Sequence, residues 1–306
     1  MNNSYQNTTH HPTVEVPNYQ ILEAIYLGVR TLVYRAIRTR DRLPVVIKLL
    51  KTEYPSFSEL VQFRNQYTIA KNIHQPGIIQ TYSLEPYRNG YALIMEDFGG
   101  VSLKEWALKE ENALSLREFL VLAIALCNTL NILYQERIIH KDIKPNNILI
   151  NPETKQIKLI DFSIASLLPR ETQALVNPKV LEGTLAYISP EQTGRMNRGI
   201  DYRTDFYSLG VTFYELLTGK LPFESNDPME LVHCHIAKTA PSVHEINPKI
   251  PSVISEIVNK LMAKNAVKSS HEVQSQNGLK VQPTSQIQLI PEKVIRFFIF
   301  TIVGLG

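Results

Sequence analysis

Two short stretches carry most of the chemistry in this sequence: HKDIKPNNIL, from His140 to Leu149, and DFS, from Asp161 to Ser163. The first contains a carboxylate at Asp142, with Lys144 and Asn147 shortly after it. The second places Asp161 directly after a short, largely apolar run. A charged turn followed by a helix cap is the alternative, but it would rarely supply these residue types in this order. We therefore expect the two stretches to form one site.

Both stretches resemble the catalytic and metal-binding loops of the protein kinase family. The resemblance implies that Asp142 accepts a hydrogen bond from a substrate hydroxyl, and that Lys144 offsets charge on the γ-phosphate of ATP. It also implies that Asn147 and Asp161 hold Mg²⁺. The Asp-x-Lys pair is similar to the serine/threonine branch of the family rather than to the tyrosine branch.

A lysine stands at the end of an apolar run, in Val45-Val46-Ile47-Lys48. The resemblance places Lys48 on the α- and β-phosphates. The alternative is a lysine that extends from an edge strand, with its stem on apolar surface and its ammonium in water. The motifs downstream favour the phosphate contact.

The stretch from Leu93 to Gly100 resembles the hinge of a kinase. In this resemblance Met95 is the gatekeeper residue, and the backbone of Glu96 and Phe98 faces adenine. Plain core packing is an equally good interpretation of Val46. The cofactor-binding residues implied by the resemblance are Ile25, Gly28, Val33, Val46, Lys48, Met95, Glu96, Phe98 and Leu149.

The hydrophobic pattern predicts two different halves. Between residues 19 and 94, β-branched runs flank a charged turn and predict antiparallel strands, while a capping box at Ser56 and Glu59 opens one helix. A helical period dominates later, after a second box at Ser115 and Glu118, and again over 205–218 before Gly219. With the resemblance, this predicts an α+β, bilobal kinase-like fold. Its parts would be a small antiparallel β-lobe (19–94), a hinge (95–100) and a larger, mostly helical lobe (101–265).

The nucleotide-binding half departs from the family in two places. Tyr26, Gly28 and Thr31 occupy the three positions of the glycine-rich loop, so only one glycine is kept. Because glycine lets backbone amides approach phosphates, we expect a looser grip on the triphosphate. Gln66 replaces the helix glutamate that normally pairs with the strand lysine. A neutral hydrogen bond is weaker than a charge-assisted one by about 1 kcal/mol, or roughly fivefold in the positioning of Lys48.

Two smaller changes concern activation. Lys141 stands where an arginine is usual, and Ser163 replaces a glycine. Lysine does not make the bidentate phosphate contacts of arginine. Activation by phosphorylation is therefore a hypothesis only, with Thr172 as the expected site.

The resemblance ends near Asn265. The family then supplies an arginine that pairs with the glutamate of the Pro-Glu motif, here Glu191, and a last helix, and the pattern shows neither. A partnerless, buried Glu191 would destabilise the large lobe by about 3 kcal/mol. Residues 266–306 form an atypical tail that ends in an aggregation-prone apolar run, as in a truncated or frame-shifted gene.

Bulk properties exclude several classes of protein. The 306 residues are 44% hydrophobic and 20% charged, a globular composition, and a net charge of +3 gives no argument for nucleic acid. Two distant cysteines, Cys127 and Cys234, indicate neither a disulfide framework nor a zinc site, and fit the cytoplasm. Residues 1–18 are predicted to be a disordered leader without signal-peptide features. The apolar stretch 294–306 is too short to span a membrane.

The leading interpretation is a serine/threonine protein kinase that uses ATP and Mg²⁺ to phosphorylate a protein hydroxyl, with its oligomeric state open. A catalytically weak or inactive ATP-binding pseudokinase, acting as a scaffold, is the main alternative. A fragment too unstable to function is another. The stretches 44–57, 64–71 and 190–197 resemble the kinase domain that heads large bacterial signalling proteins, which continue into an ATPase module, a GAF domain and a histidine kinase.

Overall fold

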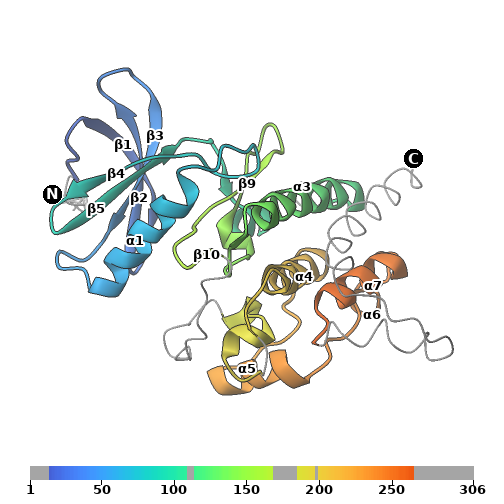
Figure 1. The fold of residues 1–306 in the computed structure, drawn as a ribbon. Helices are drawn as coiled ribbons and strands as arrows, with labels where there is room; N and C mark the ends of the chain where they lie inside the picture. Colours follow the sequence, from blue (N-terminus) through green and yellow to red (C-terminus); the bar gives the residue numbers. More distant parts are fainter. Residues whose placement is uncertain (1–13, 109–113, 168–184, 197–198, 265–306) are drawn as a thin grey trace, which may run out of the picture. The chain divides into compact units, whose positions relative to one another are not determined.

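A computed structural model of the chain describes residues 14–108, 114–167, 185–196 and 199–264. The chain divides into two compact units. The first contains the residues up to Lys71 together with Gln80–Phe98, and the second contains Asn72–Ile79 and the residues from Gly99 onward. An antiparallel sheet dominates the first unit and helices dominate the second, so the predicted bilobal α+β fold is confirmed (Figure 1).

The first unit is a five-stranded antiparallel sheet with one long helix. The strands lie in the order β1-β2-β3-β5-β4. Helix α1 contacts β4 and β5 and opens with the predicted capping box of Ser56 and Glu59. The elements are β1 (Tyr19–Leu27), β2 (Thr31–Arg38), β3 (Pro44–Leu50), α1 (Phe57–Ala70), β4 (Thr81–Tyr87) and β5 (Gly90–Glu96).

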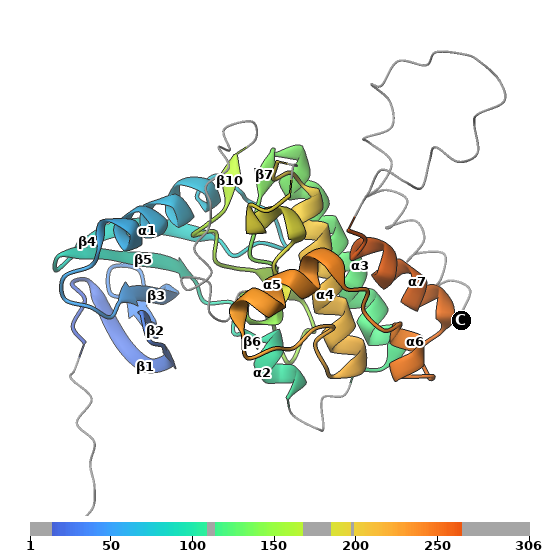
Figure 2. The same cartoon turned by 90° about the horizontal axis from the view of Figure 1, so that it is seen from below.

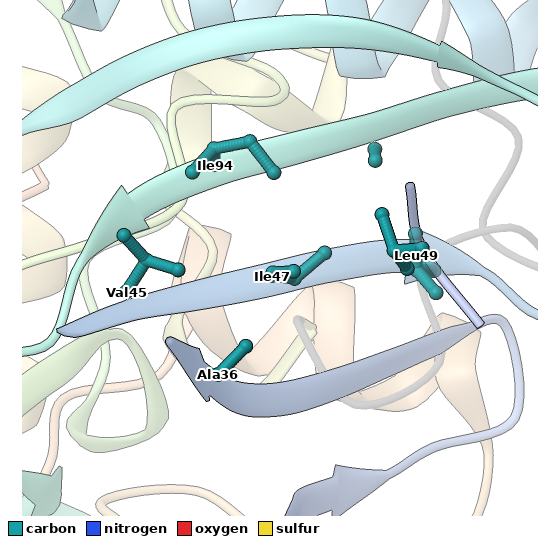
Figure 3. Packing of buried hydrophobic residues seen from close by; sticks show 7 residues of the cluster. Ala36, Val45, Ile47, Leu49 and Ile94 are labelled. Atoms are coloured by element: carbon teal, nitrogen blue, oxygen red, sulfur yellow. The ribbon is translucent and has the colours of Figure 1, made fainter. Parts of the chain in front are cut away.

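The core of this sheet follows from the two-residue period of β3. Val45, Ile47 and Leu49 point to one face and are at most 1% exposed. Ala36 of β2 and Ile94 of β5 belong to the same cluster (Figure 3). The intervening residues of β3, which include Lys48, are left on the opposite face.

Residues ahead of β1 also belong to this core. Val16 is 5% exposed and forms an isolated β-bridge with Tyr19. Val14 is partly buried against the same cluster. The packed part of the first unit therefore begins before Tyr19.

The second unit combines helices with short strands. β6, β8 and β9 form a three-stranded sheet, and β7 pairs with β10. The elements are β6 (Val101–Ser102), α2 (Leu103–Ala107), α3 (Leu116–Gln135), β7 (Ile138–Ile139), η2 (Pro145–Asn147), β8 (Ile148–Ile150), β9 (Ile157–Leu159), β10 (Ser166–Leu167), η4 (Leu185–Tyr187), η5 (Pro190–Thr193), α4 (Arg203–Thr218), α5 (Pro228–Ala237), α6 (Val243–Ile246) and α7 (Ser252–Leu261).

Helix α4 is the centre of the second unit. It contacts α3, α6 and α7, and also the 3-10 turns η4 and η5 (Figure 2). Phe213 on α4 meets Phe119 on α3 edge to face, with ring centroids 5.2 Å apart. The helix ends at the predicted Gly219, whose φ of 70° is costly for residues with a Cβ.

Helix α3 begins with the predicted capping box of Ser115 and Glu118. Of the helices in the described residues, it alone is long and apolar enough to cross a membrane, judged by length and composition. Residues along its length, from Phe119 to Leu133, are buried inside the unit. This burial favours a core helix over a membrane span.

Candidate active site

The backbone of the loop after β7 is fixed by Asp205 at the start of α4. The His140 amide donates to Asp205 Oδ2 at 2.8 Å, and the Lys141 amide donates to Oδ1 at 2.7 Å. Asp205 is 4% exposed, so these bonds form away from water. Lys141 has a φ of 66°, an uncommon value for a residue with a Cβ. Asp205 therefore anchors this loop to α4.

His140 connects the two sequence stretches, a role that the sequence pattern did not indicate. Its ring is fully buried, Nδ1 accepts from the Asp142 amide at 3.3 Å, and Nε2 donates to the Ile160 carbonyl at 3.0 Å. Phe162 packs edge to face against the ring, with centroids 4.7 Å apart. Burial lowers the pKa of His140, which favours the neutral imidazole that this bonding pattern requires. Its place beside Asp142 was the only signal for it in the sequence.

The three predicted polar residues of the loop lie in direct contact. Lys144 Nζ lies 2.9 and 2.8 Å from the two carboxylate oxygens of Asp142. Asn147 Nδ2 donates to Asp142 Oδ2 at 2.6 Å and to the Asp142 carbonyl at 2.9 Å. Both charged side chains keep a small exposed fraction, 16% for Lys144 and 12% for Asp142. The carboxylate is therefore held in one orientation while it can still be reached by a ligand.

Asp161 is tied to the same loop through the backbone. The Ile160 amide donates to the Asn147 carbonyl at 2.9 Å, which brings the residue before Asp161 against the loop. Asp161 has a φ of 67°, and its Oδ1 accepts from the Ser163 amide at 3.3 Å. The second unit therefore brings Asp161 to the loop that carries Asp142 and Asn147.

The donor set suits a hard cation. The described residues contain no cluster of three His, Cys, Asp or Glu side chains that could hold a metal alone. Asp161 carries a carboxylate. Asn147 donates through Nδ2 to Asp142 Oδ2, so its Oδ1 is the side-chain oxygen that could bind a cation. Mg²⁺ prefers oxygen ligands and usually keeps waters or substrate phosphates in its shell. The predicted pair fits a magnesium ion that is bound together with a phosphate.

In the first unit, Lys48 is held by Gln66 on α1. Lys48 Nζ donates to Gln66 Oε1 at 3.0 Å and lies 5.6 Å from the centroid of the Phe63 ring. Gln66 is 2% exposed, and its Nε2 lies 3.8 Å from Met95 Sδ. The glutamine therefore replaces the expected carboxylate as the partner of Lys48.

Three of the predicted cofactor-binding positions of the sheet, Val33, Val46 and Met95, share the face of Lys48. Val33 lies opposite Lys48 across β2 and β3, and Val46 lies opposite Met95 across β3 and β5. Directly opposed residues of antiparallel strands share a face. The Glu96 amide donates to the carbonyl of Gln80, the residue before β4, at 3.0 Å, so this amide is already bonded within the first unit.

The predicted site residues divide between the two units. The first unit holds Ile25, Gly28, Val33, Val46, Lys48, Met95, Glu96 and Phe98, and the second holds Asp142, Lys144, Asn147, Leu149 and Asp161. Their convergence on one nucleotide stays a prediction. Thr172 lies outside the described residues.

The expectation of a partnerless Glu191 was wrong. Glu191 is 2% exposed on η5, and its Oε1 accepts from the Thr204 hydroxyl at 2.9 Å. A second buried carboxylate, Glu215, accepts from the Tyr187 hydroxyl at 2.5 Å and pairs with Lys104 of α2. Neither arrangement follows from the sequence pattern, because the partners are far apart in the chain or unlike those of the family.

Comparison with known proteins agrees with this architecture. The family model described as the protein kinase domain matches residues 19–275. The chain is 34% identical over 255 residues to the serine/threonine-protein kinase PrkC of Bacillus subtilis, covering 81% of this chain and 37% of PrkC. It is 32% identical over 250 residues to a probable serine/threonine-protein kinase of Clostridium perfringens, covering 81% and 36% of the two chains. It is 30% identical over 259 residues to the serine/threonine-protein kinase PknB of Mycobacterium tuberculosis, covering 81% of this chain and 40% of PknB.

These relatives are much longer than the matched region, since the chain spans between 36% and 40% of their lengths. The family match covers most of the chain, including both units and all the candidate site residues. On this match, the chain belongs to the protein kinase domain family.

Proposed function

We propose that this chain is an active serine/threonine kinase that uses Mg²⁺-ATP to phosphorylate a protein. The observation that carries the proposal is the contact of Asp142 with Lys144 and Asn147, together with the backbone link to Asp161. An inactive scaffold would have no need to hold a carboxylate, a cation and an amide in this arrangement. The names of the relatives point to the same activity.

Each of these residues has a task in the proposed reaction. Bound Mg²⁺-ATP supplies the phosphoryl group and a cation that neutralises its charge. Asp142 accepts the proton of the acceptor hydroxyl. The oxygen of that hydroxyl bonds to the γ-phosphorus, while the bond between the γ-phosphorus and the β-phosphate oxygen breaks. Lys144, beside Asp142, offsets negative charge on the γ-phosphate, and Lys48 binds the α- and β-phosphates. Asn147 Oδ1 and the Asp161 carboxylate hold the cation.

The pseudokinase alternative rests on two features of the first unit and on the last helix of the family, which the sequence pattern lacks. Gln66 gives Lys48 a neutral partner, and the loop between β1 and β2 has a single glycine. Both changes weaken nucleotide positioning without removing a reacting group. The weakening expected from Gln66 is about fivefold, which is small beside the effect of losing a catalytic carboxylate.

A phosphate-transfer assay separates the two functions. The chain is incubated with γ-labelled ATP, Mg²⁺ and a generic basic protein, and compared with Asp142→Asn, which keeps the shape of the side chain. Asp41→Asn, in the exposed turn between β2 and β3, is the matched control. We expect label transfer by the native chain and the control, and a loss of at least a hundredfold in Asp142→Asn. Equal transfer by all three proteins would end the enzyme interpretation.

The domain organisation belongs to the same proposal. We infer a leader whose last residues, from Val14, pack on the first unit, a kinase domain over residues 19–265 that acts in the cytoplasm, and a tail over 266–306. The resemblance to the head of large bacterial signalling proteins suggests that the chain corresponds to their kinase part. Binding of a partner that carries the ATPase or histidine kinase modules would support this origin, and a pull-down with those modules would test it.

A further inference from the structure

The loop between β1 and β2 differs from a glycine-rich phosphate loop in the position of one aromatic side chain. Tyr26 takes the place of the first glycine, and its ring lies against Gly28. A Cβ built on Gly28 would be 2.7 Å from the Tyr26 hydroxyl oxygen and would also meet Cε1 of the ring. No real Cβ contact is that short, so Gly28 is the residue that leaves space for the phenol.

The strand register places Tyr26 on the face of the sheet that carries Lys48. Tyr26 lies opposite Val33 of β2, and Val33 lies opposite Lys48 of β3. Directly opposed residues of antiparallel strands share a face. The buried core residue Ile47 is on the other face, and the residue opposite it, Tyr34, packs on that core. The phenol therefore shares its face with the lysine assigned to the phosphates.

The backbone at Gly28 is already engaged. The Gly28 amide donates to the Thr31 carbonyl at 2.9 Å and closes the turn. The Gly28 carbonyl accepts from Lys51 Nζ at 3.4 Å, which brings a cation to the loop. A phosphate at this position would therefore meet a lysine and a phenol hydroxyl, in place of the amide of Gly28.

We propose that Tyr26 is a nucleotide-contacting residue whose hydroxyl donates a hydrogen bond to the polyphosphate of the bound nucleotide. This inference rests on the proposed use of ATP, and it assigns a side-chain donor to the position where the family's glycine would let the backbone approach the phosphates. Tyr26 as a whole is 57% exposed, so a ligand can approach it from solvent. A tyrosine hydroxyl is both a donor and an acceptor, and a phosphate oxygen accepts. The ligand class is a nucleoside di- or triphosphate.

The matched substitution is Tyr26→Phe, which keeps the ring and removes only the hydroxyl. Isothermal titration of the full chain with Mg²⁺-ATP and with adenosine separates the polyphosphate from the base. We expect Tyr26→Phe to weaken Mg²⁺-ATP binding about tenfold, as for the loss of one hydrogen bond to a charged group. Adenosine binding is expected to change less than twofold. Tyr54→Phe, which removes a hydroxyl from an exposed tyrosine after β3, is the control and should match the native chain.

A second variant, Tyr26→Gly, restores the family glycine and removes the ring. Weaker Mg²⁺-ATP binding in both variants supports the proposal. Unchanged or tighter binding in Tyr26→Phe, or tighter binding in Tyr26→Gly, overturns it, since the ring would then only obstruct the loop. If the native chain transfers phosphate and Tyr26→Phe binds Mg²⁺-ATP as tightly as the native chain does, only the role of Tyr26 is refuted. If the native chain binds no nucleotide, the proposed function fails as well.

Discussion

Replacing Gln66 by glutamate tests how the first unit positions Lys48. In the structure Lys48 Nζ donates to Gln66 Oε1 at 3.0 Å, a hydrogen bond to a neutral acceptor. The bond is already charge-assisted because its donor is an ammonium, and Gln66→Glu adds an opposite charge on the acceptor. Desolvation of the new carboxylate at a 2% exposed position offsets part of the added attraction. We expect a net gain of about 1 kcal/mol, or a fivefold rise in kcat/KM for ATP. Steady-state assays over a range of ATP concentrations measure it.

The matched control is Gln62→Glu, the same substitution one helical turn earlier on α1. We expect it to leave kcat/KM unchanged. If Gln66→Glu is folded but shows no rise in kcat/KM, the positioning of Lys48 does not limit nucleotide use and the reasoning fails.

A double-mutant cycle with Lys48→Met isolates the pair from the rest of the site. Gln66 is 2% exposed, so a glutamate there without the ammonium would be a buried, unpaired charge. Such a charge costs about 3 to 5 kcal/mol. Urea unfolding should therefore show that Gln66→Glu is far more destabilising in the Lys48→Met background than in the native one. Additive effects would show that the two side chains are not coupled.

Further predictions concern the second unit. Burial, with a smaller effect of Lys264, lowers the pKa of His235 to about 3, whereas its ordinary value is 6.5. Below pH 6.5 the unfolded chain therefore binds a proton at this histidine that the folded chain does not bind. The free energy of unfolding should fall by up to about 1.4 kcal/mol per pH unit as the pH is lowered toward 3. Urea unfolding between pH 7 and pH 4.5 should show a shallower pH dependence in His235→Gln, and an equal slope would refute this origin. Thr204→Val removes the hydroxyl that donates to the buried Glu191 and should lower the free energy of unfolding by about 1 to 3 kcal/mol in the same assay. Thr204→Ser keeps a hydroxyl and should lower it by less. Ser115→Ala removes the N-cap side chain of α3 and should lower the free energy of unfolding by about 1 kcal/mol, measured by thermal unfolding. An unchanged stability would show that the capping box is dispensable.

The sequence was a good guide wherever the structure depends on neighbouring residues. Some features involve only residues within one helical turn, and the amino-acid sequence alone predicted them. They are the capping boxes at Ser56 and Ser115 and the helix end at Gly219. The contacts of Asp142 with Lys144 and Asn147 also lie within six residues of chain. Short-range geometry of this kind leaves few alternatives.

Contacts between distant segments were harder to predict. Lys104 and Glu215 are 111 residues apart, and only the packing of α2 near α4 brings them together. Glu191 was expected to lack a partner because the family's arginine is missing, but a threonine on α4 supplies a hydroxyl. At Tyr26, the missing glycine was counted as a loss, since sequence alone does not show where an exposed ring will lie.

The burial of Val16 has a practical consequence for work on smaller fragments. A fragment beginning at Tyr19 would keep every strand of the sheet and every candidate nucleotide contact, yet it would lose a side chain that is 95% shielded from water in the intact unit. Full burial of a valine is worth about 1.5 to 3 kcal/mol, a sizeable part of the stability of a typical domain. Shortened forms for crystallisation or isotope labelling should therefore start no later than Val14.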